Sequence, residues 1–223
     1  MEISKGDFLI MVGSNGSGKS TFLNLLQGSD YADHGSITIN GKDISKLAEH
    51  KRSKFISRVF QNPAMGIAGE LTVLENFRLA AIRTRSKTLT VGNNYDFRRK
   101  TEEKIKTLGL GLEKKIDQRM GSLSGGQRQA LTLLMSVMDH TEVLLMDEPT
   151  AALDPASSKA IMELTEKLHK DLGLTVLLVT HDMKDSQQYG NRIIQFKEGR
   201  INKDLKEQEK KSLTLAELWQ WFS

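Results

Sequence analysis

Apolar residues fall into short continuous runs and longer helical patterns, separated by polar turns. Four runs, each followed by a polar or turn residue, are predicted to be strands: the continuous apolar runs 8–12 and 143–146, the run 174–179 with one threonine, and residues 55–60, which include Ser57 and Arg58. Residues 35–44 instead alternate between polar and apolar, and Asn40-Gly41 lies where a tight turn is expected. The pattern therefore predicts a core of buried strands and a small antiparallel sheet beside it.

Helical periodicity dominates the middle of the chain. A helix is predicted over 71–82, where Thr72 and Glu75 have the spacing of a capping box, and another from about Phe97 to Leu108. The polar residues 84–100, centred on Gly92-Asn93-Asn94, are predicted to form an exposed loop. Because strand character returns only at Val143, we expect residues 64–140 to form a helical subdomain inserted between core strands.

The C-terminal part is predicted to begin with a hairpin. Strands at 192–196 and 200–201 flank the turn 197–199. The charged run 203–211 is predicted to be solvated, and 215–222 to form a short helix whose aromatic face packs on the core. The fold class expected for the whole chain is α/β, as a single domain.

Composition narrows the possibilities. The chain has 223 residues, 38% of them hydrophobic and 27% charged, which suits a globular protein with one full core. It has no cysteine, so neither disulfides nor thiolate metal sites are available. Its 32 basic and 28 acidic side chains are interspersed, as on an ordinary solvated surface, and we expect no nucleic-acid partner. The absence of a 20-residue apolar run or a signal-like N-terminus favours a cytoplasmic protein.

The strongest chemical signal follows the first apolar run. The pattern G-x-x-x-x-G-K-[ST] is met by Gly13, Ser14, Asn15, Gly16, Ser17, Gly18, Lys19 and Ser20, and Thr21 follows. Glycines let backbone N–H groups curl around a phosphate at the start of a helix. Lys19 would reach the β- and γ-phosphates, and Ser20 would offer its hydroxyl to Mg²⁺. A glycine-rich turn with a fortuitous lysine is the alternative, which the strand before and the helix after disfavour. The chain is thus predicted to bind a nucleoside triphosphate.

Three further stretches carry candidate chemistry. Ser124 is predicted to cap a helix whose first residues, Gly125 and Gly126, leave N–H groups open to an anion, although a plain capped helix fits equally well. The strand at 143–146 delivers Asp147, predicted to hold Mg²⁺ directly or through water, and Glu148, predicted to polarise the attacking water. His181 follows the strand at 174–179.

Taken in order, these motifs resemble those of the nucleotide-binding subunit of ATP-binding cassette (ABC) transporters over nearly the whole chain. They are the phosphate loop 13–20, the Q-loop glutamine Gln61, the LSGGQ signature 123–127, the Walker B strand 143–148, the D-loop 151–154 and the switch histidine His181. The resemblance implies a P-loop NTPase (RecA-like) core with a small antiparallel β subdomain and an inserted helical subdomain.

The resemblance also implies roles and partners. Glu148, His181 and Gln61 would be catalytic, Ser20, Gln61 and Asp147 would hold Mg²⁺, and ATP would bind the phosphate loop 13–21. Signature residues Ser124, Gly125, Gly126 and Gln127 would bind ATP held by a second subunit, giving a homodimer or pseudo-dimer. The sequence alone leaves open whether the signature acts within one subunit. Integral membrane permease subunits and, indirectly, a solute-binding protein are the other expected partners, at the cytoplasmic face of the membrane.

One departure from the family pattern is visible. Family members carry an additional strand and an adenine-stacking aromatic before the phosphate loop, and nothing in residues 1–12 matches that aromatic. We therefore expect weak nucleotide affinity and poor base selectivity, because a base-stacking aromatic contributes about 1–3 kcal/mol.

The family resemblance leaves several functions open. Residues 123–154 are most similar to ATPases of uptake systems with a solute-binding protein, which favours import of a small solute, with amino-acid-like solutes as one fitting class. A non-transport cassette acting on ribosomes or DNA is an alternative. A P-loop kinase is another, although it would leave the signature and His181 without a purpose.

Overall fold

The structure, a computed structural model, describes residues 1–82, 95–139 and 141–222. Two compact units are present. The sheet unit comprises 1–58, 141–148 and 165–223, and the helical unit comprises 59–140 and 149–164. The helical subdomain predicted over 64–140 lies within the helical unit, which also contains residues 59–63 and 149–164.

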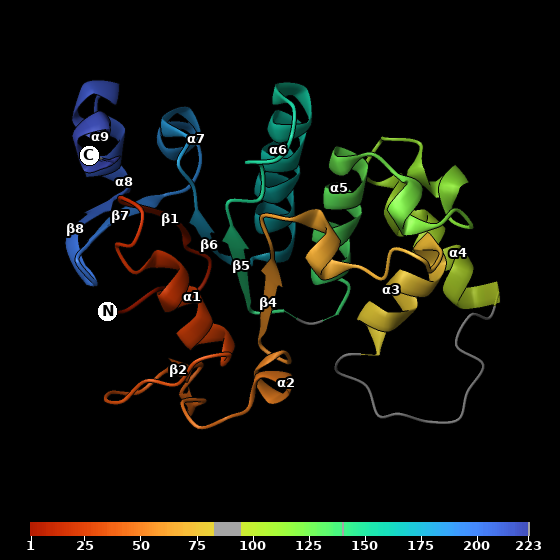
Figure 1. Ribbon diagram of the computed structural model, residues 1–223, viewed down its shortest axis with the longest axis horizontal. Helices are drawn as coiled ribbons and strands as arrows, with labels where there is room; N and C mark the ends of the chain where they lie inside the picture. The colour runs from red at the N-terminus through yellow and green to blue at the C-terminus, as the bar shows by residue number, and fades with distance from the viewer. Residues whose placement is uncertain (83–94, 140, 223) are drawn as a thin grey trace. The chain divides into compact units, whose positions relative to one another are not determined.

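The sheet unit is built on a six-stranded sheet with the order β4-β5-β6-β1-β7-β8 (Figure 1). Its strands are β1 (Phe8–Val12), β4 (Ile56–Val59), β5 (Val143–Asp147), β6 (Thr175–Val179), β7 (Arg192–Lys197) and β8 (Arg200–Lys206). Strands β5, β6, β1 and β7 pair in parallel, whereas β8 returns antiparallel to β7. The continuous apolar runs of β1 and β6 are explained by burial of every residue in them, as in a sheet covered on both faces.

Helices and a second small sheet complete this unit. The helices are α1 (Lys19–Gln27), α2 (Glu49–Arg52), α7 (Met183–Gln188), α8 (Glu207–Ser212) and α9 (Leu215–Phe222), with α6 (Pro155–Leu172) passing from the helical unit into it. Strands β2 (Thr38–Ile39) and β3 (Lys42–Asp43) pair antiparallel. Between them Asn40 and Gly41 have φ angles of 49° and 76°, as a type I′ turn requires, which confirms the predicted hairpin.

One face of the sheet packs on α1 and the β2–β3 region. Leu23 of α1 and Ile44 after β3 are completely buried against strand residues that share this face. The buried cluster consists of Leu9, Met11, Leu23, Ile44, Ile56, Leu145, Leu177, Val179, Ile194 and Phe196. This core holds α1, and with it the phosphate loop, against the ends of the central strands.

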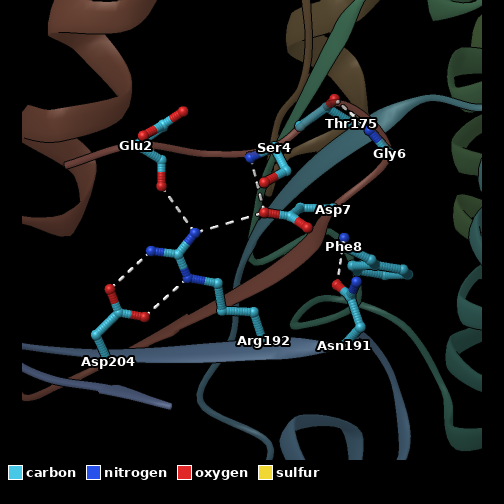
Figure 2. Close-up of polar contacts among 9 residues, drawn as sticks. All are labelled: Glu2, Ser4, Gly6, Asp7, Phe8, Thr175, Asn191, Arg192 and Asp204. Atoms are coloured by element: carbon cyan, nitrogen blue, oxygen red, sulfur yellow. Dashed lines mark hydrogen bonds and ion pairs between the residues drawn. The ribbon is translucent and has the colours of Figure 1, made fainter. Parts of the chain in front are cut away.

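The segment before β1 is held to the sheet by polar contacts, centred on Arg192 of β7 (Figure 2). Its guanidinium makes a two-point ion pair with Asp204 of β8, at 2.8 and 2.7 Å, and donates to the carbonyl oxygen of Glu2 at 2.8 Å. Asp7 lies 3.4 Å from the same group. Only 11% of the Arg192 side chain is exposed, whereas 37% of the Asp204 side chain is open to solvent.

The C-terminal charged run differs from its prediction as a solvated segment. Strand β8 continues to Lys206, and Lys210 of α8 is 4% exposed. The Lys210 ammonium donates to the carbonyl oxygens of Gln187, Tyr189 and Gly190, where α7 ends. Burial lowers the pKa of Lys210 to about 8. The prediction was wrong at this residue because a lysine can be buried where several carbonyls converge, which its neighbours in sequence do not reveal. The packing predicted for 215–222 is confirmed by the burial of Leu218 and Trp221 of α9.

The helical unit contains α3 (Val73–Ala81), α4 (Tyr95–Lys106) and α5 (Gly125–Ser136), with 3-10 turns η1 (Pro63–Gly66), η2 (Leu112–Lys115) and η3 (Met120–Ser122). The predicted capping box of Thr72 and Glu75 is present at α3. The buried core consists of Val73, Leu74, Phe77, Ile105, Leu112, Ile116, Met120, Leu123, Leu131, Leu134 and Met135. Helix α4 begins at Tyr95, so the predicted loop 84–100 is wrong over 95–100, and 83–94 lie outside the described residues.

Helix α5 packs closely on the start of α6 within the helical unit. A Cβ atom on Gly126 would lie 2.5 Å from Ser157 Oγ and 2.8 Å from Ser157 Cβ. A Cβ on Gly125 would meet only Leu153 Cδ2, at 3.4 Å. Asp154, which ends the D-loop, accepts a hydrogen bond from the Ser157 backbone N–H at 3.0 Å and so fixes the first turn of α6. The glycine at position 126 is therefore required by this close approach.

We predict that Gly126→Ala and Gly125→Ala affect stability differently. Gly126→Ala should lower the free energy of unfolding by about 1–3 kcal/mol because its methyl group overpacks against Ser157. Gly125→Ala should be neutral or stabilising by up to about 1 kcal/mol because alanine favours helix. Denaturant unfolding of both variants measures this, and Gly126→Ala/Ser157→Gly should recover the loss. Equal effects at the two glycines would contradict the packing argument.

Helix α7 contains an acidic group whose titration the fold perturbs. Asp182 caps this helix by accepting from the backbone N–H groups of Lys184 and Asp185, at 2.7 and 3.0 Å. Burial, together with the smaller effect of the Asp182 charge, raises the pKa of Asp185 from 3.8 to about 6. The folded chain thus binds a proton at Asp185 more readily than the unfolded chain, so stability declines as the pH rises from about 4 to above 6.

Asp185→Asn should remove this penalty. At pH 7.5 the variant should be about 1–2 kcal/mol more stable than the wild type. This is less than the full ~1.4 kcal/mol per pKa unit, because solvent screens a partly buried group. The difference should shrink toward zero as the pH falls below about 4, where Asp185 is protonated in the folded state and increasingly protonated in the unfolded state. Thermal unfolding across pH 3.5 to 8 measures it, and a gain that persists at pH 3.5 would show that another cause is at work.

Candidate functional site

The predicted phosphate loop connects the end of β1 to the start of α1. Gly18 precedes α1 with a φ angle of 104°, and Gly13 has a φ angle of 145°. Residues other than glycine rarely adopt either angle. A Cβ on Gly13 would lie 2.2 Å from the carbonyl oxygen of Phe196 on β7. The backbone N–H of Gly199 also donates to the Ser17 carbonyl oxygen at 3.0 Å, so the β7–β8 turn supports the loop from one side.

Lys19 lies within the loop that it is predicted to serve. It is 5% exposed, and its Nζ donates to the carbonyl oxygens of Gly13 and Ser14 at 2.7 and 3.0 Å. Burial lowers the pKa of Lys19, whereas the charges of Glu148 and Asp147 act in the opposite direction. The charges of both carboxylates therefore act on the loop lysine.

Asp147 and Glu148 end β5 beside β6. Asp147 pairs with Val179 in the parallel register, and the Glu148 N–H donates to the Val179 carbonyl oxygen at 3.0 Å. Glu148 has a φ angle of 48°, a left-handed conformation that is uncommon for a residue with a side chain. The chain thus turns sharply at the predicted catalytic residue.

His181 contacts Glu148 directly. Its Nε2 lies 2.7 Å from Glu148 Oε1, and the two side chains are 37% and 24% exposed. The backbone on both sides of the histidine is fixed, since Asp182 N–H donates to Thr180 Oγ1 and Asp182 then caps α7. A glutamate oriented by a histidine at a partly open position is suited to polarising a water molecule.

Arg58 of β4 is a residue at this site that sequence reasoning missed. Its Nη2 donates to Asp147 Oδ2 at 2.6 Å, and its side chain is only 9% exposed. The one available signal is a charged residue within an otherwise apolar strand, which in a buried sheet calls for a partner. No sequence rule indicates that the partner is Asp147, because 89 residues separate the two.

The helical unit carries the other predicted residues. Gln61 is exposed and follows β4, just before Asn62 caps η1. Ser124 caps α5 as predicted, accepting from Gln127 N–H, while the Gln127 side-chain carbonyl accepts from Ser124 N–H. Both the side chain and the backbone N–H of Gln127 therefore serve the capping box, and a nucleotide contact at this position stays a prediction.

Gln129 is a second residue that the sequence analysis did not single out. It is completely buried on α5, and its amide nitrogen donates to the carbonyl oxygens of Phe60 and Pro149, at 3.2 and 2.9 Å. These carbonyls immediately precede Gln61 and immediately follow Glu148 in the sequence. Gln129 thus links α5, which begins at the signature, to both of these segments.

The two units hold separate groups of predicted site residues. The phosphate loop, Asp147, Glu148 and His181 lie in the sheet unit, whereas Gln61 and the signature lie in the helical unit.

Among the described residues no three His, Cys, Asp or Glu side chains are grouped as a metal site. None of the described helices has the length and apolarity needed to cross a membrane. Phe8 is buried in β1 with its ring 5.3 Å from that of His169, a position that serves packing and not adenine stacking.

Similarity to known proteins agrees with this geometry. The family described as ABC transporter matches residues 1–151. A tyrosine transport ATP-binding protein of Clostridioides difficile is 41% identical over the whole chain and 88% of its own length. The macrolide export ATP-binding/permease protein MacB of Vibrio parahaemolyticus is 36% identical over 92% of this chain, which spans only 30% of that longer protein.

Solved structures give the same result. A dimeric ATP-binding cassette in a post-hydrolysis state with ADP and phosphate superposes with a TM-score of 0.78 at 31% identity, covering 93% of this chain and 88% of that one. The cbiO1 protein of Clostridium perfringens, described as part of the transporter complex cbiONQ, gives 0.80 at 26% identity, covering 99% and 84%. The chain belongs to the ABC transporter family, as an ATP-binding cassette with ATPase activity.

Proposed function

We propose that this cassette couples ATP hydrolysis to the import of a small, amino-acid-like solute through separate permease subunits. The observation that carries the proposal is the sheet-unit site, in which Glu148 is held by His181 beside the phosphate loop. The solute class is supported by the relative named for tyrosine transport, which matches the full length of this chain. The kinase and the ribosome- or DNA-acting alternatives lose their support with the assignment to the transporter family.

Mg²⁺ is proposed as the metal of the site. Its preferred ligands are oxygens, and it is usually held by few protein groups together with phosphate oxygens of the substrate. Ser20 and Asp147 offer such oxygens, with Gln61 as the third proposed ligand, and the described residues contain no cluster of acids or histidines that would bind a metal alone. Bound Mg²⁺ would supply neutralisation of charge on the β- and γ-phosphates.

The chain's own groups would perform the remaining steps. Lys19 and the loop N–H groups would bind the phosphates of ATP. Glu148 would accept a proton from, or polarise, the attacking water, and His181 would hold the Glu148 carboxylate in place and contact the γ-phosphate. Because Ser20 lies in the first turn of α1 and Asp147 ends β5, their spacing depends on the packing of α1 on the sheet.

A two-fold dimer is proposed as the active assembly. The phosphate loop of one subunit would face Ser124, Gly125 and Gly126 of the other, so that two ATP molecules lie between them. Similar cassettes solved as dimers support this arrangement. A solute-binding protein would act indirectly through the permease, which would hold the dimer at the cytoplasmic face of the membrane. Nucleic acid is not among the proposed partners.

Glu148→Gln should separate ATP binding from hydrolysis. Loss of the carboxylate should lower kcat by about 10²- to 10⁴-fold, while ATP binding and ATP-dependent dimerisation persist. Steady-state hydrolysis with Mg²⁺ and light scattering measure the two effects. The control is Glu207→Gln, an exposed glutamate of the same unit paired with Lys211. Hydrolysis by Glu148→Gln within a few-fold of the wild type would contradict the role of Glu148.

Solute import requires a cellular test. Cells that contain the cassette with its permease should accumulate labelled tyrosine or a related amino acid, and cells carrying Glu148→Gln should not. Accumulation independent of Glu148, or faster loss of preloaded solute with the wild-type cassette, would contradict import.

A further inference from the structure

Arg58 lies at the junction of three elements of the sheet unit. Its Nη2 donates to Asp147 Oδ2 on β5 at 2.6 Å. Its Nη1 donates to Asn24 Oδ1 and Gln27 Oε1 on α1, at 2.7 and 2.8 Å. One guanidinium thus connects β4, the end of β5 and the helix that follows the phosphate loop.

The two amide partners of Arg58 share a helix face with the proposed metal ligand Ser20. Positions 20, 24 and 27 are separated by four and three residues, a spacing that places side chains on one face of an α-helix. The amides are also oriented, because Asn24 Nδ2 donates to Asp30 at 3.3 Å and Gln27 Nε2 donates to Glu49 at 2.5 Å. Their oxygens are thereby turned toward the guanidinium, which fixes Arg58 beside the Ser20 face of α1.

The charges around Asp147 are balanced by this arrangement. Asp147 and Glu148 bring two carboxylates, and Lys19, which interacts electrostatically with both, brings one cation. Arg58 brings the second cation at hydrogen-bond distance from Asp147. A cation in contact with a carboxylate lowers its attraction for a further cation, and a hydrogen bond to Oδ2 leaves Oδ1 as the oxygen for a metal or its water.

We propose that Arg58 is a positioning residue for the metal–nucleotide complex, which orients the Asp147 carboxylate and prevents a divalent cation from binding there before ATP. Phosphate oxygens then bring the negative charge that the metal requires, so metal and nucleotide bind together. This inference rests on the proposed metal site at Ser20 and Asp147.

A matched ion pair elsewhere in the sheet unit provides the control. Arg192 pairs with Asp204 (Figure 2) at 2.7 Å, against 2.6 Å for Arg58 with Asp147. The exposed fractions of the two arginine side chains are 11% and 9%. Arg192 contacts none of the proposed site residues in the hydrogen bonds and ion pairs of the described chain. Arg192→Gln therefore reports what loss of a buried arginine pair does to stability alone.

The experiment uses Mn²⁺ as an EPR-visible probe of the proposed Mg²⁺ site. Free Mn²⁺ is measured in titrations of the whole chain, first without nucleotide and then with a non-hydrolysable ATP analogue. Without nucleotide, Arg58→Gln should bind Mn²⁺ about tenfold more tightly than the wild type, because one opposing charge is removed. The Mn²⁺ affinity of Arg58→Lys, which keeps the charge, should stay within about threefold of the wild-type affinity. The Mn²⁺ affinity of Arg192→Gln should equal that of the wild type.

Hydrolysis gives a second readout. Arg58→Gln should lower kcat at least tenfold with little change in KM for ATP, because the carboxylate is misoriented while the phosphate loop is intact. An unchanged or weaker Mn²⁺ affinity in folded Arg58→Gln, or an equal shift in Arg192→Gln, would overturn the proposal. If Arg58→Gln does not fold, Asn24→Asp replaces it, because the new carboxylate competes with Asp147 for the guanidinium. Asn24→Asp should raise the Mn²⁺ affinity about threefold. An unchanged Mn²⁺ affinity in this variant would also overturn the proposal.

Asp147→Asn separates this inference from the function on which it rests. If that variant binds Mn²⁺ with the ATP analogue as tightly as the wild type, the proposed metal site itself is wrong. If it loses Mn²⁺ affinity and the Arg58 variants behave as the wild type, the metal site stands and only the role of Arg58 fails.

Discussion

The parallel register of the three central strands is the constraint on which the rest of the structure depends. Met11 of β1 and Asp147 of β5 both pair with Val179 of β6, so these strands end at the same level of the sheet. The phosphate loop, the carboxylates and His181 each begin within a few residues of that level. A shift of one residue would turn every side chain of a strand to the other face and would remove Leu9, Leu145 and Leu177 from the core that they share on one side of the sheet. Hydrophobic burial of the strands thereby brings the loop lysine, the two carboxylates and the histidine to the same edge of the sheet.

The division into two units follows from two separate hydrophobic cores. The sheet unit packs Leu23 of α1 against the strands, whereas the helical unit buries Phe77 and Leu131 among its own helices. The chain passes between the units directly after Arg58 and directly after Glu148, as well as at 140–141 and 164–165. The first two of these crossing points are joined within the sheet unit by the ion pair of Arg58 with Asp147. The ion pair of Asp147 thus lies beside two of the connections to the helical unit.

Local rules explain most of what could be predicted from the sequence. The phosphate loop, the capping boxes at Thr72 and Ser124 and the turn at Asn40-Gly41 each depend on residues within a few positions, and each is present. Lys210, Arg58 and Gln129 could not be predicted, because their partners lie 20 or more residues away. In each case a polar side chain is buried by distant groups, and a single sequence holds no record of which groups converge. The proposed roles of Gln61 and the signature depend in turn on a second subunit.

The conformation of Glu148 shows how the site departs from the local rules that build the sheet around it. A left-handed φ at a non-glycine residue costs on the order of 1 kcal/mol, and the adjoining Pro149 prevents the strand from continuing regularly. Two contacts offset that cost: the N–H bond to Val179, which retains strand pairing, and the contact of the carboxylate with His181. The turn would be a defect in a strand selected only for stability. At this position the turn ends β5 after Asp147. It allows two adjacent acids to contact different residues, so that Asp147 pairs with Arg58 and Glu148 contacts His181.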